Sequence, residues 1–117
     1  MKLFLFGGSE SQTAQVATMM GQIKQVLLDL NPNSVLNIPF ARYNPVDIDW
    51  PVGWFRKMME GTGIEVLDAS VSGDIKKAKE SVIYINGGVG KLELLDAINS
   101  NVELKNLVLN AKYIRVL

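Results

Sequence analysis

The stretch Val82-Ile83-Tyr84-Ile85-Asn86-Gly87-Gly88-Val89-Gly90-Lys91-Leu92-Glu93-Leu94-Leu95-Asp96-Ala97-Ile98 decides the fold of this chain. Its first residues are almost all β-branched or aromatic, which is typical of a strand buried on both faces. The glycines that follow predict a sharp turn with exposed backbone N–H groups. Leu92, Leu95 and Ile98 then recur at helical spacing, with Leu94 beside them. Such a strand, turn and helix N-terminus can present donors to an anion or oxyanion, although every parallel sheet also contains ordinary turns of this kind.

The rest of the chain repeats this alternation of strand and helix. Apolar runs predict further strands over 2–6, 34–39, 64–67 and 113–117. Helical spacing, caps and breakers predict helices over about 9–30, 49–61, 74–80, 91–98 and 103–111. We therefore expect residues 1–117 to form a single three-layer α/β/α domain with a doubly wound, mainly parallel, five-stranded sheet.

Ligands of such sheets bind beyond the carboxyl ends of the strands. The pair Gly7-Gly8 and the turn Gly87-Gly88-Val89-Gly90 both follow predicted strands, so both are expected at that edge. Neither matches a nucleotide-binding motif: Gly90-Lys91 is followed by Leu92 instead of Ser or Thr, and residues 7–12 do not read G-x-G-x-x-G.

Composition excludes several classes of function. Lys+Arg and Asp+Glu both number 12, so there is no basic excess for nucleic acid or an anionic membrane. The absence of cysteine excludes a disulfide scaffold and a thiolate nucleophile, and it fits a cytoplasmic protein. The apolar run at residues 3–6 is too short for a signal peptide or a membrane span.

The chain also lacks histidine, which limits its chemistry. Ser9 and Ser11 therefore have no usual activating base, and helix capping explains them better than nucleophilic catalysis. Asp47 and Asp49 flank a helix start, where acidic residues suit the helix dipole better than a metal site. We expect no metal and no cofactor.

Two surfaces are candidates for a partner. Gln12, Gln15, Gln22 and Gln25 line one side of the first helix, which predicts either a neutral solvated face or a subunit contact. The last strand ends with the chain, and a buried-type strand without a covering helix exposes an apolar patch. A homo-oligomer through either surface is expected, unless the chain is cut short of its natural end.

The strings Asn37-Ile38-Pro39-Phe40-Ala41 and Gly87-Gly88, followed by Leu94-Leu95, resemble the N-terminal half of the dipeptidase E (aspartyl dipeptidase) and cyanophycinase family of serine peptidases. The similarity covers essentially the whole chain. It implies a flavodoxin-like, or class I glutamine amidotransferase-like, fold. The family's third glycine, Asn and Thr align with Val89, Gly90 and Lys91, which is a departure from its pattern.

The resemblance implies a serine peptidase that cleaves short acidic peptides through an acyl-enzyme. Val89 would donate a backbone N–H to the oxyanion, and Gly87, Gly88 and Gly90 would bind substrate. The family's serine, histidine and acidic partner lie at or beyond Leu117, so this chain alone is expected to be inert. A catalytically dead relative and an unrelated, non-catalytic flavodoxin-like binding or assembly domain are the alternatives.

Overall fold

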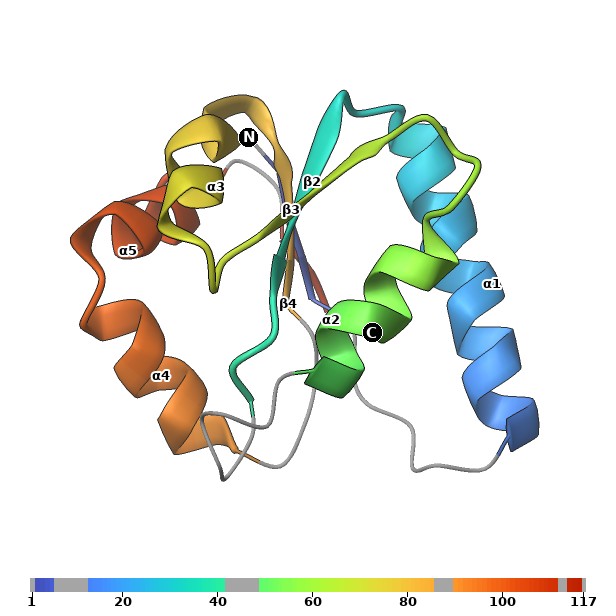
Figure 1. The fold of residues 1–117 in the computed structure, drawn as a ribbon, viewed down its shortest axis with the longest axis horizontal. Helices are drawn as coiled ribbons and strands as arrows, with labels where there is room; N and C mark the ends of the chain where they lie inside the picture. Colours follow the sequence, from blue (N-terminus) through green and yellow to red (C-terminus); the bar gives the residue numbers. More distant parts are fainter. Residues whose placement is uncertain (1, 6–12, 42–48, 86–89, 112–113, 117) are drawn as a thin grey trace.

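A computed structural model describes residues 2–5, 13–41, 49–85, 90–111 and 114–116 (Figure 1). All strand pairs are parallel, and the strand order is β3-β2-β4-β1-β5. The strands are β1 (Lys2–Leu5), β2 (Ser34–Ile38), β3 (Glu65–Asp68), β4 (Val82–Ile85) and β5 (Ile114–Val116). The helices are α1 (Thr13–Leu30), α2 (Asp49–Met58), α3 (Ser72–Lys77), the 3-10 helix η1 (Ala78–Glu80), α4 (Lys91–Asn99) and α5 (Val102–Leu109).

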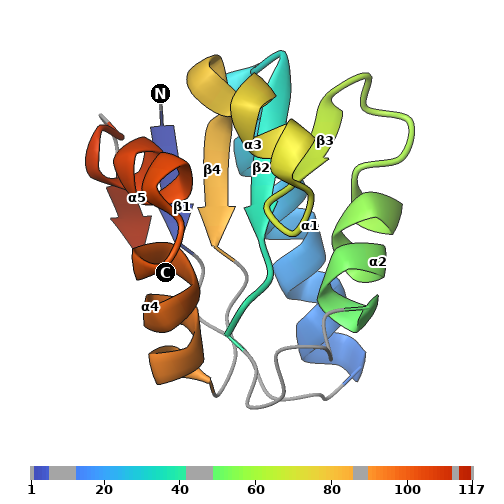
Figure 2. The ribbon, with the colours of Figure 1, turned by 60° about the vertical axis from the view of Figure 1, so that its left-hand side comes forward.

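The elements form three layers. Helices α1 and α2 cover one face of the sheet, and α3, α4 and α5 cover the other, as Figures 1 and 2 show from two directions. Each face has its own apolar core. The first contains Ile23, Leu27, Val35, Phe55, Met58, Met59, Val82 and Tyr84, and the second contains Leu36, Ile38, Leu67, Ala69, Ile75, Ala78, Ile83, Ile85 and Leu104.

Strand β4 shows why both faces need a covering layer. Successive side chains of a strand point to opposite faces. Val82 and Tyr84 accordingly belong to the core under α1 and α2, whereas Ile83 and Ile85 belong to the core under α3 and α5. Because all four are buried, a strand without polar alternation is stable only between two helical layers.

The predicted α/β fold with a parallel sheet is confirmed, and its layers are compatible with a flavodoxin-like arrangement. The order places β4 between β1 and β2, whereas flavodoxin has the order 2-1-3-4-5. The third strand is shifted by one residue from its predicted range, and the helix predicted over 74–80 is divided into α3 and η1.

Two helices are followed by residues with a left-handed backbone. Asn31 adopts a left-handed φ of 49°, and its N–H donates to the carbonyl oxygens of Leu27 and Leu28. Gly61, with a φ of 78°, lies just beyond α2. The left-handed conformation is strained for most residues but accessible to Asn and Gly, so both positions stop a helix.

The inward face of α4 differs from the predicted apolar stripe. Leu94 and Ile98 pack against the core, whereas Leu92 and Leu95 are 73% and 54% exposed. The two pairs alternate along the helix, and the local sequence spacing is compatible with burying either pair. The docking direction of α4 on the sheet selects Leu94 and Ile98.

The surfaces expected to bind a partner are described only in part. β5 lies at a sheet edge beside β1, but its side chains lie outside the described part of the structure. On α1, Gln22 and Gln25 are exposed, and Gln25 Nε2 donates to Asp29 Oδ1 at 2.8 Å. Gln12 and the side chain of Gln15 are not among the described parts. Within the described residues, no helix is long and apolar enough to span a membrane.

Candidate functional site at the carboxyl edge of the sheet

The ends of β2 and β4 are joined by a backbone hydrogen bond. The Gly90 N–H donates to the carbonyl oxygen of Ala41 at 3.1 Å, and the Gly90 carbonyl accepts from the Leu94 N–H at 3.0 Å. Gly90 therefore connects the segment that leaves β2 with the first turn of α4. The two strands are neighbours and parallel, so both segments emerge at the same edge of the sheet.

Of the four residues predicted to bind the oxyanion or the substrate, the structure describes only Gly90. Gly87, Gly88 and Val89 lie outside the described residues. Gly90 is buried, with a φ of −89° and a ψ of 63°, so its backbone does not require glycine for a positive φ. Its N–H is already used by Ala41, so a ligand role for Gly90 would have to come from another atom or from its lack of a side chain.

A row of buried polar side chains crosses the sheet next to this edge. Asn37 on β2 is the register partner of Asp68 on β3 and of Tyr84 on β4. Asn37 follows Val35 by two residues and Asp68 follows Val66 by two, so the row faces α1 and α2. Asn37 and Asp68 are only 1% and 3% exposed.

Asp68 is held by the turn that follows β3. Its Oδ1 accepts hydrogen bonds from the Ser70 N–H at 2.9 Å and from the Ser70 hydroxyl at 2.7 Å. The Asp68 N–H in turn donates to Asp74 Oδ2 at 2.9 Å, in the first turn of α3. These hydrogen bonds shape the connection from β3 to α3. They also satisfy Oδ1 of the Asp68 carboxylate, and burying a carboxylate without hydrogen bonds would destabilise the fold.

Asn37 is different, because its Oδ1 is buried without a hydrogen-bond partner among the described residues. Most buried side-chain oxygens in folded proteins have a partner, so such an atom calls for an explanation. Oδ1 can only accept a hydrogen bond, and any group that met it would be a donor. Asn37 was not among the residues that the sequence predicted for a site. A polar residue inside the apolar run of 34–39 was the available signal.

Tyr84 contributes a buried aromatic ring at the β4 end of the row. Its ring stacks on Phe55 with centroids 4.8 Å apart and an interplanar angle of 21°. Burial raises the pKa of Tyr84 far above its ordinary value of 10.0, because the phenolate would be poorly solvated. Tyr84 therefore stays neutral across the physiological range and is not a general base.

The other candidates from the sequence do not form a site in the described residues. Ser9, Ser11 and Asp47 fall outside them, and Asp49 is exposed in the first turn of α2. No cluster of three or more metal-ligating side chains occurs within the described residues. Met58 and Met59, at and just beyond the end of α2, lie in the core under α1 and α2, and Trp54 packs against that core.

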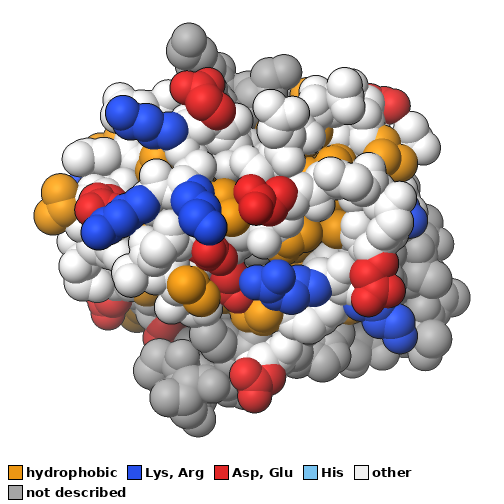
Figure 3. All heavy atoms as spheres, turned by 45° about the horizontal axis from the view of Figure 1, so that its top comes forward, with side chains coloured by type: hydrophobic (Ala, Val, Ile, Leu, Met, Phe, Trp, Pro, Cys, Tyr) orange, Lys and Arg blue, Asp and Glu red, His pale blue; other side chains and the backbone are white. Residues whose placement is uncertain are grey.

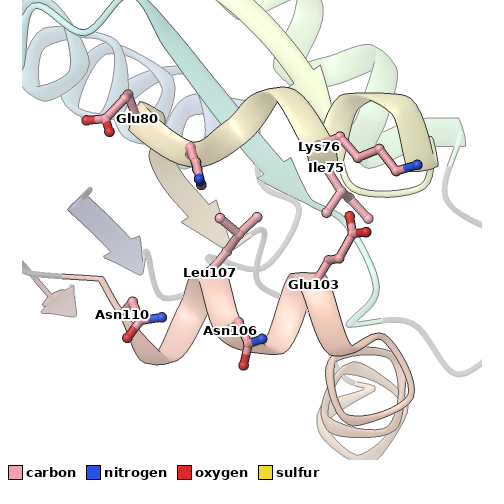
Figure 4. Close-up of a pocket in the computed structure, with 8 residues that line it drawn as sticks. Ile75, Lys76, Glu80, Glu103, Asn106, Leu107 and Asn110 are labelled. Atoms are coloured by element: carbon pink, nitrogen blue, oxygen red, sulfur yellow. The ribbon is translucent and has the colours of Figure 1, made fainter.

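A groove with a volume of about 670 Å³ lies between α3–η1 and α5, away from the predicted residues. Figure 4 shows Ile75 and Leu107 pointing into the space between the helices, with Glu103 reaching up from α5. The remaining lining residues are Lys76, Lys79, Glu80, Asn106 and Asn110. Two lysines and two glutamates balance each other, so the groove has no preference for one sign of charge.

The surrounding surface has the same character. Figure 3 shows lysine, acidic and apolar side chains interspersed over the upper face. A mixed surface of this kind fits the formal net charge of zero. The face in Figure 3 therefore shows no basic stripe of the kind that a nucleic acid requires.

Comparison with known proteins identifies no family for this chain. No protein-family model matches it, and no curated protein matches its sequence.

Proposed function

We propose that this chain is the N-terminal part of a serine peptidase of the dipeptidase E and cyanophycinase type, which hydrolyses short acidic peptides. The observation that carries the proposal is the hydrogen bond between the Gly90 N–H and the Ala41 carbonyl. The first string of the resemblance ends at Ala41, and Gly90 lies between the two parts of the second, Gly87-Gly88 and Leu94-Leu95. A resemblance by chance would not require them to meet.

The parallel sheet supports the same proposal. The carboxyl ends of β1, β2, β4 and β5 point to one edge, where α/β proteins bind their ligands. In the proposed family, the strand that matches β5 leads into the Gly-x-Ser-x-Gly nucleophile elbow. A segment continuing beyond β5 would enter that edge, two strands away from β4. The five-stranded, doubly wound, glutamine amidotransferase-like arrangement is part of this proposal.

Within the intact enzyme, the nucleophilic serine would attack the peptide carbonyl with histidine as its base. The resemblance assigns the backbone N–H of Val89 to the resulting oxyanion, and Gly87 and Gly88 to the substrate. This chain has no histidine, so it cannot supply the usual base. We therefore expect the 117-residue chain to be catalytically inactive on its own.

Reading the encoding gene beyond codon 117 tests the proposal. We expect a Gly-x-Ser-x-Gly motif directly after the codons for β5 and a histidine codon downstream. The extended protein should hydrolyse an aspartyl dipeptide faster than the matched asparaginyl dipeptide, and replacing the elbow serine by alanine should abolish turnover. A continuation without serine or histidine, or turnover by the 117-residue chain itself, would contradict the proposal.

Titration of the ¹⁵N-labelled chain with an acidic dipeptide tests the binding residues. We expect the amide signals of Gly87, Gly88 and Val89 to shift. The Gly90 amide is the internal control, because its hydrogen bond to Ala41 withholds it from a ligand. Equal shifts for all four amides, or none, would count against the assigned donors.

A non-catalytic binding or assembly domain is the second candidate. The exposed leucines of α4 favour it, since large exposed apolar side chains in a row mark contact surfaces. Inorganic phosphate or sulfate that shifts the glycine-turn amides, together with a gene that lacks the serine elbow, would favour this candidate over the peptidase.

A further inference from the structure

Asn37 and Asp68 form a buried pair of hydrogen-bond acceptors at the carboxyl edge of the sheet. Asn37 is the penultimate residue of β2, Asp68 is the last residue of β3, and the two are register partners. Their side chains lie on the same face of the sheet, and both are almost completely buried. Ligands of parallel α/β proteins bind at this edge, so the pair lies next to the place where a ligand is expected.

The pair lacks a positively charged partner. Asp68 Oδ1 accepts from the N–H and the hydroxyl of Ser70, and among the described residues its carboxylate makes no ion pair with Lys or Arg. Asn37 Oδ1 has no hydrogen-bond partner in the same part of the structure. Buried charges in proteins are normally paired, and buried amide oxygens normally accept a hydrogen bond. A positively charged donor would therefore satisfy both side chains.

An ammonium group fits this pair better than other cations do. Two acceptors that bond one ammonium nitrogen at about 2.8 Å and a tetrahedral angle lie about 4.6 Å apart, and neighbouring strands are separated by about 4.8 Å. A guanidinium group prefers both oxygens of one carboxylate, but Ser70 already occupies Oδ1 of Asp68. Calcium takes about six to eight oxygen ligands, and the described residues contain no group of three metal-ligating side chains.

We propose that Asn37 and Asp68 bind the free α-ammonium group of the peptide substrate. This inference rests on the proposed function, and it concerns a part of the substrate that the glycine turn is not expected to hold. Asn37 Oδ1 accepts one N–H of the ammonium group, and Asp68 supplies a second acceptor and the opposite charge. The pair thereby selects peptides with an unblocked N-terminus. In the free chain the Asn37 oxygen remains unsatisfied, so the site lowers stability for the sake of binding.

Two ligands that differ only in the ammonium group test the site. L-aspartyl-L-leucine has this group, and N-succinyl-L-leucine is the same molecule without the amino group. Titration of the ¹⁵N-labelled chain, followed at the amides of Gly87 and Gly88, gives a dissociation constant for each ligand. We expect the constant for N-succinyl-L-leucine to be at least about tenfold higher, because this ligand cannot form the charge-assisted hydrogen bonds.

Two variants connect this preference to the two side chains. Asn37→Leu and Asp68→Asn should each raise the constant for L-aspartyl-L-leucine by at least about fivefold, without raising that for N-succinyl-L-leucine by more than about twofold. Asp96→Asn is the matched control, because Asp96 is exposed on α4, in the layer over the other face of the sheet (Figure 2). It should leave both constants within about twofold.

Stability measurements separate weaker binding from unfolding. Asn37→Leu removes an unsatisfied acceptor and should be at least as stable as the unmodified chain. The amide of Asp68→Asn can still accept from Ser70, and circular dichroism and the urea midpoint verify the fold of both variants. Higher stability together with weaker binding is the result that a merely structural role of Asn37 would not give.

Four results would overturn the inference. Equal affinity of the unmodified chain for both ligands would reject the ammonium site and leave the peptidase proposal standing. Unchanged affinity and lower stability in Asn37→Leu would indicate a buried water molecule. Binding of Mg²⁺ or Ca²⁺ that Asp68→Asn abolishes would assign the pair to a metal ion. If neither ligand shifts the amides of the glycine turn, both the peptidase proposal and this site are rejected.

Discussion

Tyr84 illustrates how burial changes the chemistry of one side chain. Its ring lies between β4 and α2, stacked on Phe55, and burial raises the pKa of its hydroxyl above 10.0. A group whose pKa is higher in the folded state favours folding while it is protonated. That contribution is complete below the unfolded value of about 10 and is lost as pH rises above it.

We therefore expect the free energy of unfolding to fall steeply above pH 10, and to fall less in Tyr84→Phe. The Phe variant keeps the ring and removes the ionisable hydroxyl. Urea midpoints of both proteins between pH 8 and pH 11 measure the difference. A constant gap between the two proteins over this range would show that Tyr84 does not ionise on unfolding.

Asn37 provides the second prediction at this scale. Its Oδ1 is buried without a partner in the described residues, and an unsatisfied buried oxygen is destabilising. Asn37→Leu should raise the free energy of unfolding by about 1 kcal/mol. Asn37→Asp should lower it by about 3 kcal/mol at neutral pH, because a buried charge would lie beside Asp68. A loss of stability in Asn37→Leu would show that the oxygen has a partner in solution.

At the scale of single elements, α2 and the turn after it contain a matched pair of glycines. Gly53 lies within α2, and Gly61 has a φ of 78° beyond its end. A Cβ atom added at either position would meet no atom within 4 Å. The two positions therefore differ in backbone conformation and not in the space available to a side chain.

Gly53→Ala should stabilise the protein by about 0.5–1 kcal/mol, because alanine is the better helix former. Gly61→Ala should destabilise it by about 1 kcal/mol, because alanine is strained at a positive φ. Thermal or urea unfolding of the two variants measures both effects. Changes of the same sign would contradict the conformational explanation.

The cap of α5 allows a similar comparison. Asn101 Oδ1 accepts from the Leu104 N–H at 3.0 Å, and Leu104 is buried in the core under α3 and α5. Asn101→Ala should cost about 1 kcal/mol of stability. Asn99→Ala, at the exposed end of α4, is the control and should change stability by less than about 0.5 kcal/mol. Equal effects would show that the cap contributes nothing specific.

At the scale of the whole molecule, the sheet separates two cores that must unfold together. Ile23 on α1 lies in one core, and Ile75 on α3 lies in the other. Ile23→Val and Ile75→Val should each lower the free energy of unfolding by about 0.5–1.5 kcal/mol. Their effects should add within about 0.5 kcal/mol, because the two residues belong to separate cores on opposite faces of the sheet. A double variant that departs from the sum by more than 1 kcal/mol would indicate coupling through the sheet.

Local patterns in the sequence were sufficient to predict the elements. Apolar runs identified β2 and β4, and Asn31 and Gly61, which accept positive φ angles, follow the ends of α1 and α2. These signals act over a few residues, since the periods of strands and helices and the conformational freedom of Asn and Gly are local properties. The alternation of elements was then enough to predict a parallel sheet.

The site was less predictable, because it depends on which strands become neighbours. No local pattern places Asn37 beside both Asp68 and Tyr84, and no local pattern predicts the bond between Gly90 and Ala41. The spacing of Leu92, Leu94, Leu95 and Ile98 fits a helix but does not say which pair faces the core. That choice follows from how α4 docks on the sheet.

By itself, therefore, the sequence determined the type and approximate extent of each strand and helix, and the parallel α/β class. The tertiary structure alone decided the strand order, the buried polar row and the exposed leucines of α4. The physical reason is range: hydrophobic periodicity and capping are encoded in adjacent residues, whereas strand neighbours and docking directions result from packing between segments far apart in the chain.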